Sequence, residues 1–241
     1  MKILLTTITF CILLSIALVP DVFGHGVGGE TLLPVDIGDR MATISINVEP
    51  PIYDPTNDEQ RILIKFFNAE TQQVIENVYY KIKISNGVDF IEDTFFDELG
   101  FLILNFQKTN SDIISIDGIK ESTTNAWMHD SNKPLVIKSS LFDQGGLYYV
   151  DVEILGYDSS DNLLDEPIVF NAAVSIASKT LHNIPDSNQN SYEFGITSYY
   201  DAINNFEYDS KEQEISFSMP FTWTESYIEQ IEIIHEEFHV P

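Results

Sequence analysis

Apolar and polar residues alternate with a period of two along much of this chain, and this alternation restricts the fold more than any other feature. Within residues 43–48, the apolar side chains of Ile44, Ile46 and Val48 alternate with polar ones. The same alternation recurs at 62–64, 78–84 and 150–154. Many residues in these runs are β-branched or aromatic, and such residues fit a pleated sheet better than a helix. The alternation therefore predicts half-buried β-strands.

Turn-forming residues separate the apolar runs. They occur at Pro50-Pro51, Asp54-Pro55-Thr56-Asn57, Asn86-Gly87, Leu99-Gly100, Asp117-Gly118, Gly145-Gly146 and Asp158 to Asn162. Short strands spaced by roughly 8 to 15 residues are typical of a sandwich and not of alternating β and α units. No segment before residue 222 shows a helical stripe. We therefore expect an all-β fold.

Tyr148 follows Gly145-Gly146 at the start of an alternating strand. This arrangement resembles the tyrosine corner of immunoglobulin-like sandwiches, where the phenol bonds to an upstream backbone group. We therefore predict an immunoglobulin-like antiparallel β-sandwich over residues 41–178, with 147–156 as its penultimate strand and 168–176 as its last. An ordinary turn before an ordinary strand is the alternative interpretation.

The regions outside the sandwich differ in composition. Residues 25–40 are rich in glycine near their start, which favours a flexible N-terminal arm, and the polar residues 179–191 favour a linker. Residues 192–241 again carry strand patterns. A segment of this size buries too little apolar surface by itself to offset its ordering entropy, so we expect the start of a second, incomplete β domain. Docking of these strands on the first domain is the alternative.

The first 24 residues have the pattern of a secretory signal peptide. Lys2 precedes an apolar run, Pro20 ends it, and Gly24 offers a small residue at a cleavage point. We predict cleavage after Gly24. The apolar run is marginal for spanning a hydrocarbon core of roughly 30 Å, so an uncleaved anchor is the alternative. The single cysteine, Cys11, lies in this segment, which excludes a disulfide framework and a thiolate metal site.

The balance of charge limits the partners. The chain has 38 acidic and 12 basic residues, a formal charge of −26. Nucleic-acid binding requires clustered cations, and an anionic membrane surface would repel this chain. With 44% apolar residues the chain can still form a packed core. The expected partner is an extracytoplasmic ligand or protein, and the sequence does not predict the oligomeric state.

His25 would become the N-terminal residue after cleavage at Gly24. An N-terminal histidine offers both its amine and its imidazole to one metal ion, and with a second histidine it can form a copper-binding brace. His129, between Met128 and Asp130, is the first candidate partner, and His182 is the other. The alternative is that His25 follows the cleavage point by chance and only begins a glycine-rich arm. Without this brace we expect no cofactor.

Two other patterns suggest chemistry more weakly. Residues 235–239, with the sequence His-Glu-Glu-Phe-His, match the zinc-protease string, which requires a helix. The isoleucines between 228 and 234 favour a strand instead, and a strand would separate His235 and His239 by about 13 Å. The acidic clusters at 54–59, 89–98 and 158–166 offer oxygen ligands for hard cations, but none has the spacing of a calcium-binding loop, so we favour solvated faces as their explanation. No catalytic triad, phosphate-binding loop or dinucleotide fingerprint is evident.

Several short stretches resemble a group of secreted β-sandwich proteins of ammonia-oxidising archaea. They are Gly24-His25-Gly26, Gly28-Gly29-Glu30-Thr31, Pro34, Ile37-Gly38-Asp39, the Gly-Gly-Leu-Tyr at 145–148, Met219-Pro220-Phe221-Thr222-Trp223 and His235-Glu236. The resemblance implies export from an archaeal cell and a chain that continues past residue 241, but it transfers no catalytic residue. We therefore expect an exported, non-catalytic, immunoglobulin-like binding or structural protein of the cell surface or extracytoplasmic space. The alternatives are an extracytoplasmic copper-binding protein and, last, a zinc metallohydrolase.

Overall fold

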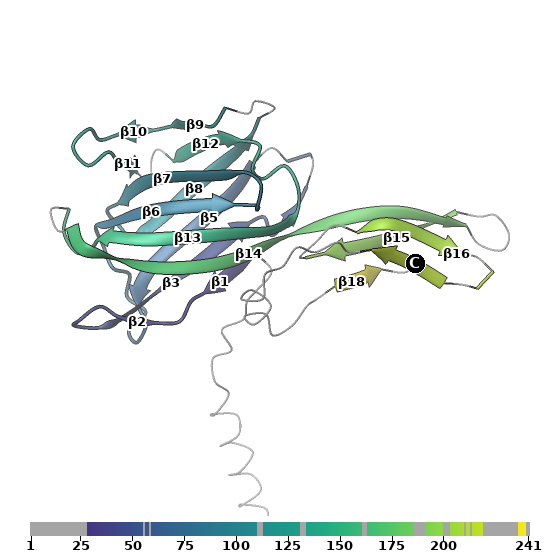
Figure 1. Ribbon diagram of the computed structural model, residues 1–241, viewed down its shortest axis with the longest axis horizontal. Coiled ribbons are helices and arrows are strands. Elements are labelled where there is room, and N and C mark those ends of the chain that lie inside the picture. The colour runs from purple at the N-terminus through teal and green to yellow at the C-terminus, as the bar shows by residue number, and fades with distance from the viewer. Residues whose placement is uncertain are drawn as a thin grey trace, which may run out of the picture.

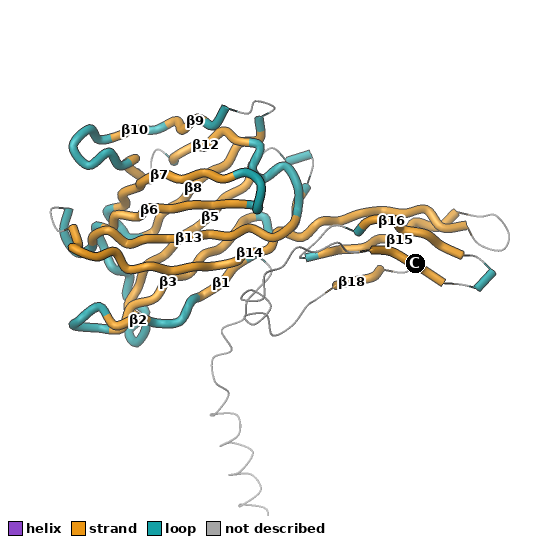
Figure 2. The backbone as a smooth tube through the Cα atoms, viewed as in Figure 1, coloured by secondary structure: helices purple, strands orange, loops and turns teal. Residues whose placement is uncertain are grey.

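The computed structural model shows an all-β protein (Figure 1, Figure 2). It describes residues 28–54, 56–57, 59–109, 113–130, 134–160, 163–185, 191–199, 203–209, 211–212, 214–218 and 236–239. Among these residues there are strands, turns and loops but no helix, so none of them forms a helix of the length and apolarity that a bilayer crossing requires. The expectation of an all-β fold is confirmed. The predicted leader, residues 1–24, lies outside the described residues.

Most of the strands belong to two sheets, whose strands up to residue 178 form the main body. The order of the first sheet is β1 (Gly29–Thr31), β3 (Met41–Glu49), β5 (Glu59–Asn68), β8 (Phe101–Lys108), β12 (Leu135–Ser139) and β9 (Ser115–Asp117), with β2 (Val35–Asp36) beside β3. The order of the second sheet is β10 (Ile119–Lys120), β11 (Trp127–His129), β7 (Phe90–Asp97), β6 (Val78–Ser85), β13 (Gly146–Gly156), β14 (Leu163–Pro185), β15 (Ser191–Ser198) and β18 (Glu236–His239), with β4 (Ile52–Tyr53) beside β14. A separate hairpin consists of β16 (Asn204–Asp209) and β17 (Glu214–Ser218).

The hydrophobic core lies between the two sheets. The apolar positions of the alternating runs point into it, as the sequence predicts: Ile44, Ile46, Ile62, Ile64, Ile82, Ile84, Val150 and Val152 are all buried. Each of these residues has a more exposed polar or charged neighbour on the opposite side of its strand. The period-two pattern is therefore confirmed as the pattern of a two-layer, sandwich-like structure.

The sequence analysis predicts an antiparallel sandwich, but each sheet contains parallel as well as antiparallel pairs. β12 runs parallel to β8, and β11 runs parallel to β7. The reason is the connection between β8 and β13, which adds β9 to the first sheet, β10 and β11 to the second, and then β12 to the first again. After this excursion, β12 reaches β8 in the same direction.

The N-terminal arm expected over residues 25–40 is docked where the structure describes it. Residues 29–31 and 35–36 form β1 and β2, and both strands pair with β3. The N–H of Gly28 donates to the carbonyl of Ser175 over 2.9 Å. Glu30 is only 4% exposed. Glycine content thus indicated flexibility, whereas strand pairing to β3 orders this segment.

The sequence analysis predicts a linker over residues 179–191, but the structure has a paired strand at residues 179–185. These residues continue β14, which is 23 residues long, and pair antiparallel with β15. In Figure 1, β14 leaves the two-sheet body and enters a second group of strands. We call residues 179–185 together with β15 to β18 the extension. Polar residues such as Lys179 and Asn183 are exposed positions of this strand, and composition alone does not distinguish them from residues of a linker.

Candidate functional site

His129 lies in a buried pair with Asp97. The two residues are opposite one another in the parallel pairing of β11 with β7. His129 Nδ1 is 2.5 Å from Asp97 Oδ2, and the side chains are 5% and 3% exposed. The other carboxylate oxygen of Asp97 accepts a 2.7 Å hydrogen bond from the N–H of Phe101. Because a buried carboxylate requires such partners, this pair fastens β11 to β7.

A second aspartate, Asp93, lies on the same side of β7 as Asp97 and holds the first residue of β11. Asp93 Oδ2 accepts a 2.9 Å hydrogen bond from Trp127 Nε1, and Lys120 Nζ is 3.0 Å from Asp93 Oδ1. Lys120 Nζ also lies 5.0 Å from the centroid of a Trp127 ring. The acidic cluster 89–98 therefore includes two strand-joining side chains, which the sequence analysis missed. The sequence contains a signal for them: by the period of two, Asp93 and Asp97 fall on the same side of β7 as the buried Ile91 and Phe95.

His182 occupies a different environment, in the extension. Its ring stacks on Phe206 of β16, with centroids 3.8 Å apart and planes 18° apart. His182 Nε2 lies 3.3 Å from Thr180 Oγ1. Phe206 also approaches Phe194 of β15 at 5.8 Å. His182 therefore helps to pack the β16–β17 hairpin against β14 and β15.

The structure does not bring His129 and His182 together. β11 lies at one edge of the two-sheet body, whereas the part of β14 that contains His182 has left that body (Figure 1). Within the ranges that the structure describes, no group of three or more His, Cys, Asp or Glu side chains is placed to hold a metal ion. His25 lies outside those ranges, so its pairing with either histidine stays a prediction.

The segment that matches the zinc-protease string is extended where the structure describes it. Residues 236–239 form β18, which pairs antiparallel with β15. A zinc-protease string requires a helix, because one helical turn places its two histidines on the same metal. The backbone here follows the strand interpretation instead. His235 lies outside the described residues.

Tyr148 makes the hydrogen bond that the sequence predicts. Its hydroxyl donates over 2.6 Å to the backbone carbonyl of Gln144, four residues upstream. The ring centroid lies 4.5 Å from that of Phe142, which in turn is 4.6 Å from Phe106. Burial, followed by the nearby charge of Asp143, raises the pKa of Tyr148 well above its usual range. The phenol is therefore neutral over the physiological range and serves as a hydrogen-bond donor.

A small pocket opens beside this aromatic cluster. Its cavity volume is about 10 Å³, and it is lined by Tyr53, Asn57, Glu59, Gln60, Phe106, Lys108, Ser139 and Phe142. Lys108 Nζ donates to the Tyr53 hydroxyl over 3.0 Å. Pockets that hold small-molecule ligands usually measure roughly 300–1,000 Å³. This pocket therefore has room for about one water molecule and not for a small-molecule ligand.

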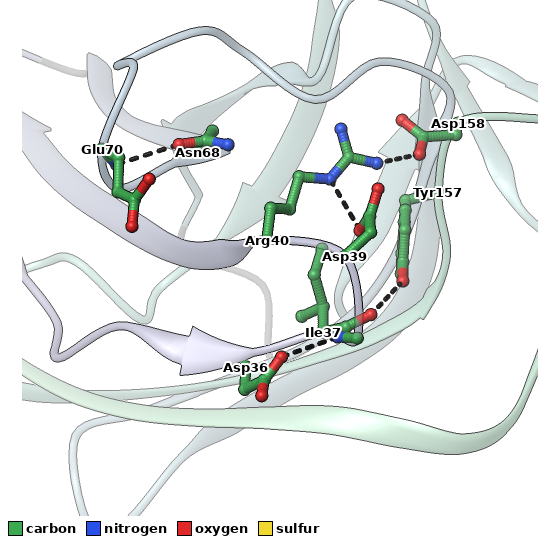
Figure 3. A network of polar contacts seen from close by, with 9 residues as sticks. Asp36, Ile37, Asp39, Arg40, Asn68, Glu70, Tyr157 and Asp158 are labelled. Atoms are coloured by element: carbon green, nitrogen blue, oxygen red, sulfur yellow. Dashed lines mark hydrogen bonds and ion pairs between the residues drawn. The ribbon is translucent and has the colours of Figure 1, made fainter.

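Figure 3 shows a network around Arg40 that joins distant loops. Arg40 forms ion pairs with Asp39 and with Asp158, and its guanidinium lies 5.9 Å from the Tyr157 ring centroid. The Tyr157 hydroxyl donates to the carbonyl of Ile37 over 3.3 Å. These contacts fix the turn between β2 and β3 against the end of β13. Arg40 is therefore engaged in holding the fold together.

Asn68, also in Figure 3, organises the turn after β5. Its side-chain oxygen accepts hydrogen bonds of 2.9 Å from the backbone N–H groups of Glu70 and Thr71. Such side-chain to backbone bonds replace ladder hydrogen bonds where a strand ends. The network in this view is therefore structural.

Comparison with protein-family models, with curated proteins and with solved structures gives no significant match for this chain. The structure defines the class as an all-β protein with two packed, mixed sheets and a strand that continues into an extension. The function is argued below from the residues themselves.

Proposed function

We propose that this chain is an exported, non-catalytic, immunoglobulin-like binding or structural protein of the cell surface or extracytoplasmic space. Export rests on the predicted leader, residues 1–24. The immunoglobulin-like assignment and the structural role rest on the strand arrangement.

The strand order supports an immunoglobulin-like sandwich. β3, β5 and β8 are neighbours in one sheet, and β7, β6, β13 and β14 are neighbours in the other. Immunoglobulin-like sandwiches likewise place their first, second and fifth strands in one sheet and the third, sixth and seventh in the other. Tyr148 stands near the start of β13, the position of the tyrosine corner. The segment from β9 to β12 is then an insertion before the last two strands.

The observation that carries the proposed role is the continuity of β14. This strand pairs with β13 over residues 163–176, with β4 at residues 177 and 178, and with β15 over residues 178–185. Since paired residues follow one another without a gap from residue 168 to residue 185, no free backbone remains between the main body and the extension. A joint of this kind holds two β units at a fixed separation, which suits a spacer or a module that presents a binding surface.

The contacts at the joint reinforce this interpretation. The N–H of Ala177 donates to the carbonyl of Pro51 over 2.8 Å. Ala177 and Tyr199 are buried against each other, and Leu147 packs against them. The joint is therefore held by side-chain packing as well as by its hydrogen bonds.

The copper-binding alternative gains no specific support. His129 directs Nδ1 to Asp97 within a buried pair, and His182 is stacked on Phe206. Each histidine thus already has a structural task.

The test is to express the full chain in an archaeal host, separate cytosolic from extracytoplasmic fractions and sequence the N-terminus of the product. We expect the protein outside the cytosol with His25 as its first residue. A Leu13→Arg/Leu14→Arg variant, which interrupts the apolar run of the leader, should remain inside as the control. Wild-type protein that stays soluble in the cytosol with Met1 intact would overturn the proposal.

A further inference from the structure

Asn86 and Gly87 lie in the turn that joins β6 to β7, and they form the only Asn-Gly pair in the sequence. Ser85 pairs with Phe90 at the base of this turn, and the N–H of Asn86 donates to the carbonyl of Asp89 over 3.2 Å. Gly87 is exposed, with a φ of +89° and, apart from its chain neighbours, no atom within 4 Å of where a Cβ would lie. The peptide nitrogen of Gly87 is therefore shielded neither by a side chain of its own residue nor by a distant segment.

Three hydrogen bonds hold the Asn86 carboxamide and this nitrogen in place. Asn86 Oδ1 accepts from the N–H groups of Asp89 over 2.8 Å and of Val88 over 3.0 Å. These two donors stabilise the negative charge that develops on Oδ1 when a nucleophile adds to Asn86 Cγ. The N–H of Gly87 donates over 3.0 Å to Ser85 Oγ, a hydroxyl that can pass the departing proton to water. The turn thus supports addition of the Gly87 nitrogen to Asn86 Cγ.

We propose that Asn86 is a site of spontaneous covalent modification, deamidation through a cyclic succinimide, which the fold leaves reactive. In this step the Gly87 nitrogen forms a bond to Asn86 Cγ and gives its proton to solvent. The bond from Cγ to Nδ2 breaks, and Nδ2 takes up a proton and leaves as ammonia. Water then opens the ring at either carbonyl and yields aspartate or isoaspartate, without any oxidant or reductant. This modification goes beyond the proposed function and does not require export.

Asp117-Gly118 is the corresponding aspartate pair, which could form the same ring with loss of water, and the fold protects it. Asp117 is the last residue of β9, where it pairs with Val136, and its Oδ2 lies 2.8 Å from Lys138 Nζ. A Cβ on Gly118 would lie 2.4 Å from Leu135 Cδ2, so this glycine is closely packed. Ring formation requires the backbone to rotate, and strand pairing together with this packing opposes the rotation.

The reaction would change the character of the hairpin tip. Val88 and Phe90 are 88% and 55% exposed, and either product adds a carboxylate beside them in addition to that of Asp89. Isoaspartate also adds one carbon to the main chain between the paired residues Ser85 and Phe90, which we expect to loosen the end of the β6–β7 ladder. The aspartate product keeps the backbone path and a side-chain oxygen as acceptor.

The experiment is peptide mapping by mass spectrometry of protein purified after expression of the full chain. One sample is incubated folded at mildly alkaline pH and a second is incubated unfolded in urea, and chromatography separates aspartate from isoaspartate peptides. The folded protein should form both acids at Asn86 at a rate within tenfold of that of the unfolded chain. At Asp117, isoaspartate should form in the unfolded chain and be suppressed at least tenfold in the folded protein.

Gly87→Ala places a methyl group beside the attacking nitrogen and should slow the reaction at Asn86 at least tenfold. Gly38→Ala is the matched control, because Gly38 also combines a positive φ, +100°, with open space but follows Ile37. If circular dichroism shows that Gly87→Ala does not fold, Asn86→Gln replaces it and should give no product. Absence of product at Asn86 in the folded protein, an undiminished rate in the variant, or a folded protein that reacts at Asp117 as fast as the unfolded chain would each overturn the proposal.

Discussion

The carboxylate of Glu30 accepts a 2.9 Å hydrogen bond from the backbone N–H of Ala173, which lies 143 positions later in the chain. The N–H of Ala173 is directed away from β13, toward the side of β14 that faces β1. Glu30 is buried, so its side chain takes the place of a strand partner and of water at this position. The N-terminal strand thereby closes one side of the two-sheet body.

Replacing Glu30 should test this closure. Glu30→Ala leaves the N–H of Ala173 buried without an acceptor, which we expect to lower the free energy of unfolding by about 1–3 kcal/mol. Glu30→Gln keeps a side-chain oxygen and should cost less. Urea denaturation followed by circular dichroism measures both, with exposed Glu70→Ala as the control. Equal effects of the alanine and glutamine variants would contradict the assigned acceptor role.

Removing one partner of the Asp97–His129 pair should be costly. Asp97→Ala leaves a buried histidine and the N–H of Phe101 without their acceptor, and breaking a buried pair typically costs about 3–5 kcal/mol. In the Asp97→Ala background, His129→Ala should add much less than it costs alone. Denaturant unfolding of the four proteins in this cycle measures the coupling. Additive effects would show that the two side chains do not act as a pair.

Tyr148 should make the stability sensitive to alkaline pH. Its pKa is raised in the folded protein, chiefly by burial, so the folded state favours the neutral phenol. The resulting stability is complete below the unfolded pKa of about 10 and is lost as pH rises toward the folded pKa. Tyr148→Phe should cost about 1 kcal/mol at neutral pH through the lost hydrogen bond, and it should weaken the decline above pH 10.

Unfolding measured from pH 7 to 11 tests this behaviour. Some decline should persist in Tyr148→Phe, because burial and the nearby Asp97 also raise the pKa of Tyr80. Tyr192→Phe, at an exposed position, is the control and should follow the wild type. A Tyr148→Phe profile identical to the wild type would refute the prediction.

Gly100 permits the close turn between β7 and β8. Its φ is +70°, and an added Cβ would lie 1.8 Å from the carbonyl oxygen of Ile75. Gly100→Ala should therefore cost about 3 kcal/mol or more, since backbone strain and overpacking each contribute about 1–3 kcal/mol. Gly87 has a φ of +89° with open space around it, so Gly87→Ala should cost only about 1 kcal/mol. Thermal unfolding of both variants measures this difference.

The joint at Ala177 should lose rigidity when its hydrogen bond is removed. Ala177→Pro deletes the N–H that donates to Pro51 and places a proline inside a paired strand. We expect faster proteolysis between the main body and the extension, together with a broader distribution of shapes in small-angle scattering. Ala177→Ser retains the N–H and should behave as the wild type. An unchanged cleavage pattern in the proline variant would argue against a rigid joint.

Local features of this fold could be predicted from the sequence. The inward positions of β3 follow from alternation within residues 43–48, because successive side chains of a strand point to opposite faces. The hydrogen bond from Tyr148 to Gln144 spans only four residues, so a short motif suffices to indicate it. The strand over residues 236–239 follows from the isoleucine-rich sequence before it and from the position of Pro241.

Other features depend on contacts between distant segments. Composition describes residues 25–40 as an arm because of their glycines, and residues 179–191 as a linker because of their polar residues. Contacts with distant strands order the described parts of these segments: residues 28–36 contact β3 and β14, and residues 179–185 pair with β15. Likewise, Asp97 and His129 are 32 residues apart, and nothing local to either residue indicates the other.

The amino-acid sequence by itself determined that the protein is built from strands and which side of many strands is buried, because the period of two acts over neighbouring residues. The tertiary structure decided the order of the strands, the parallel pairing of β12 with β8, the continuation of β14 into the extension, and the partners of Glu30 and His129. These depend on which distant strands meet, and the free energy of that choice is shared among residues far apart in the chain.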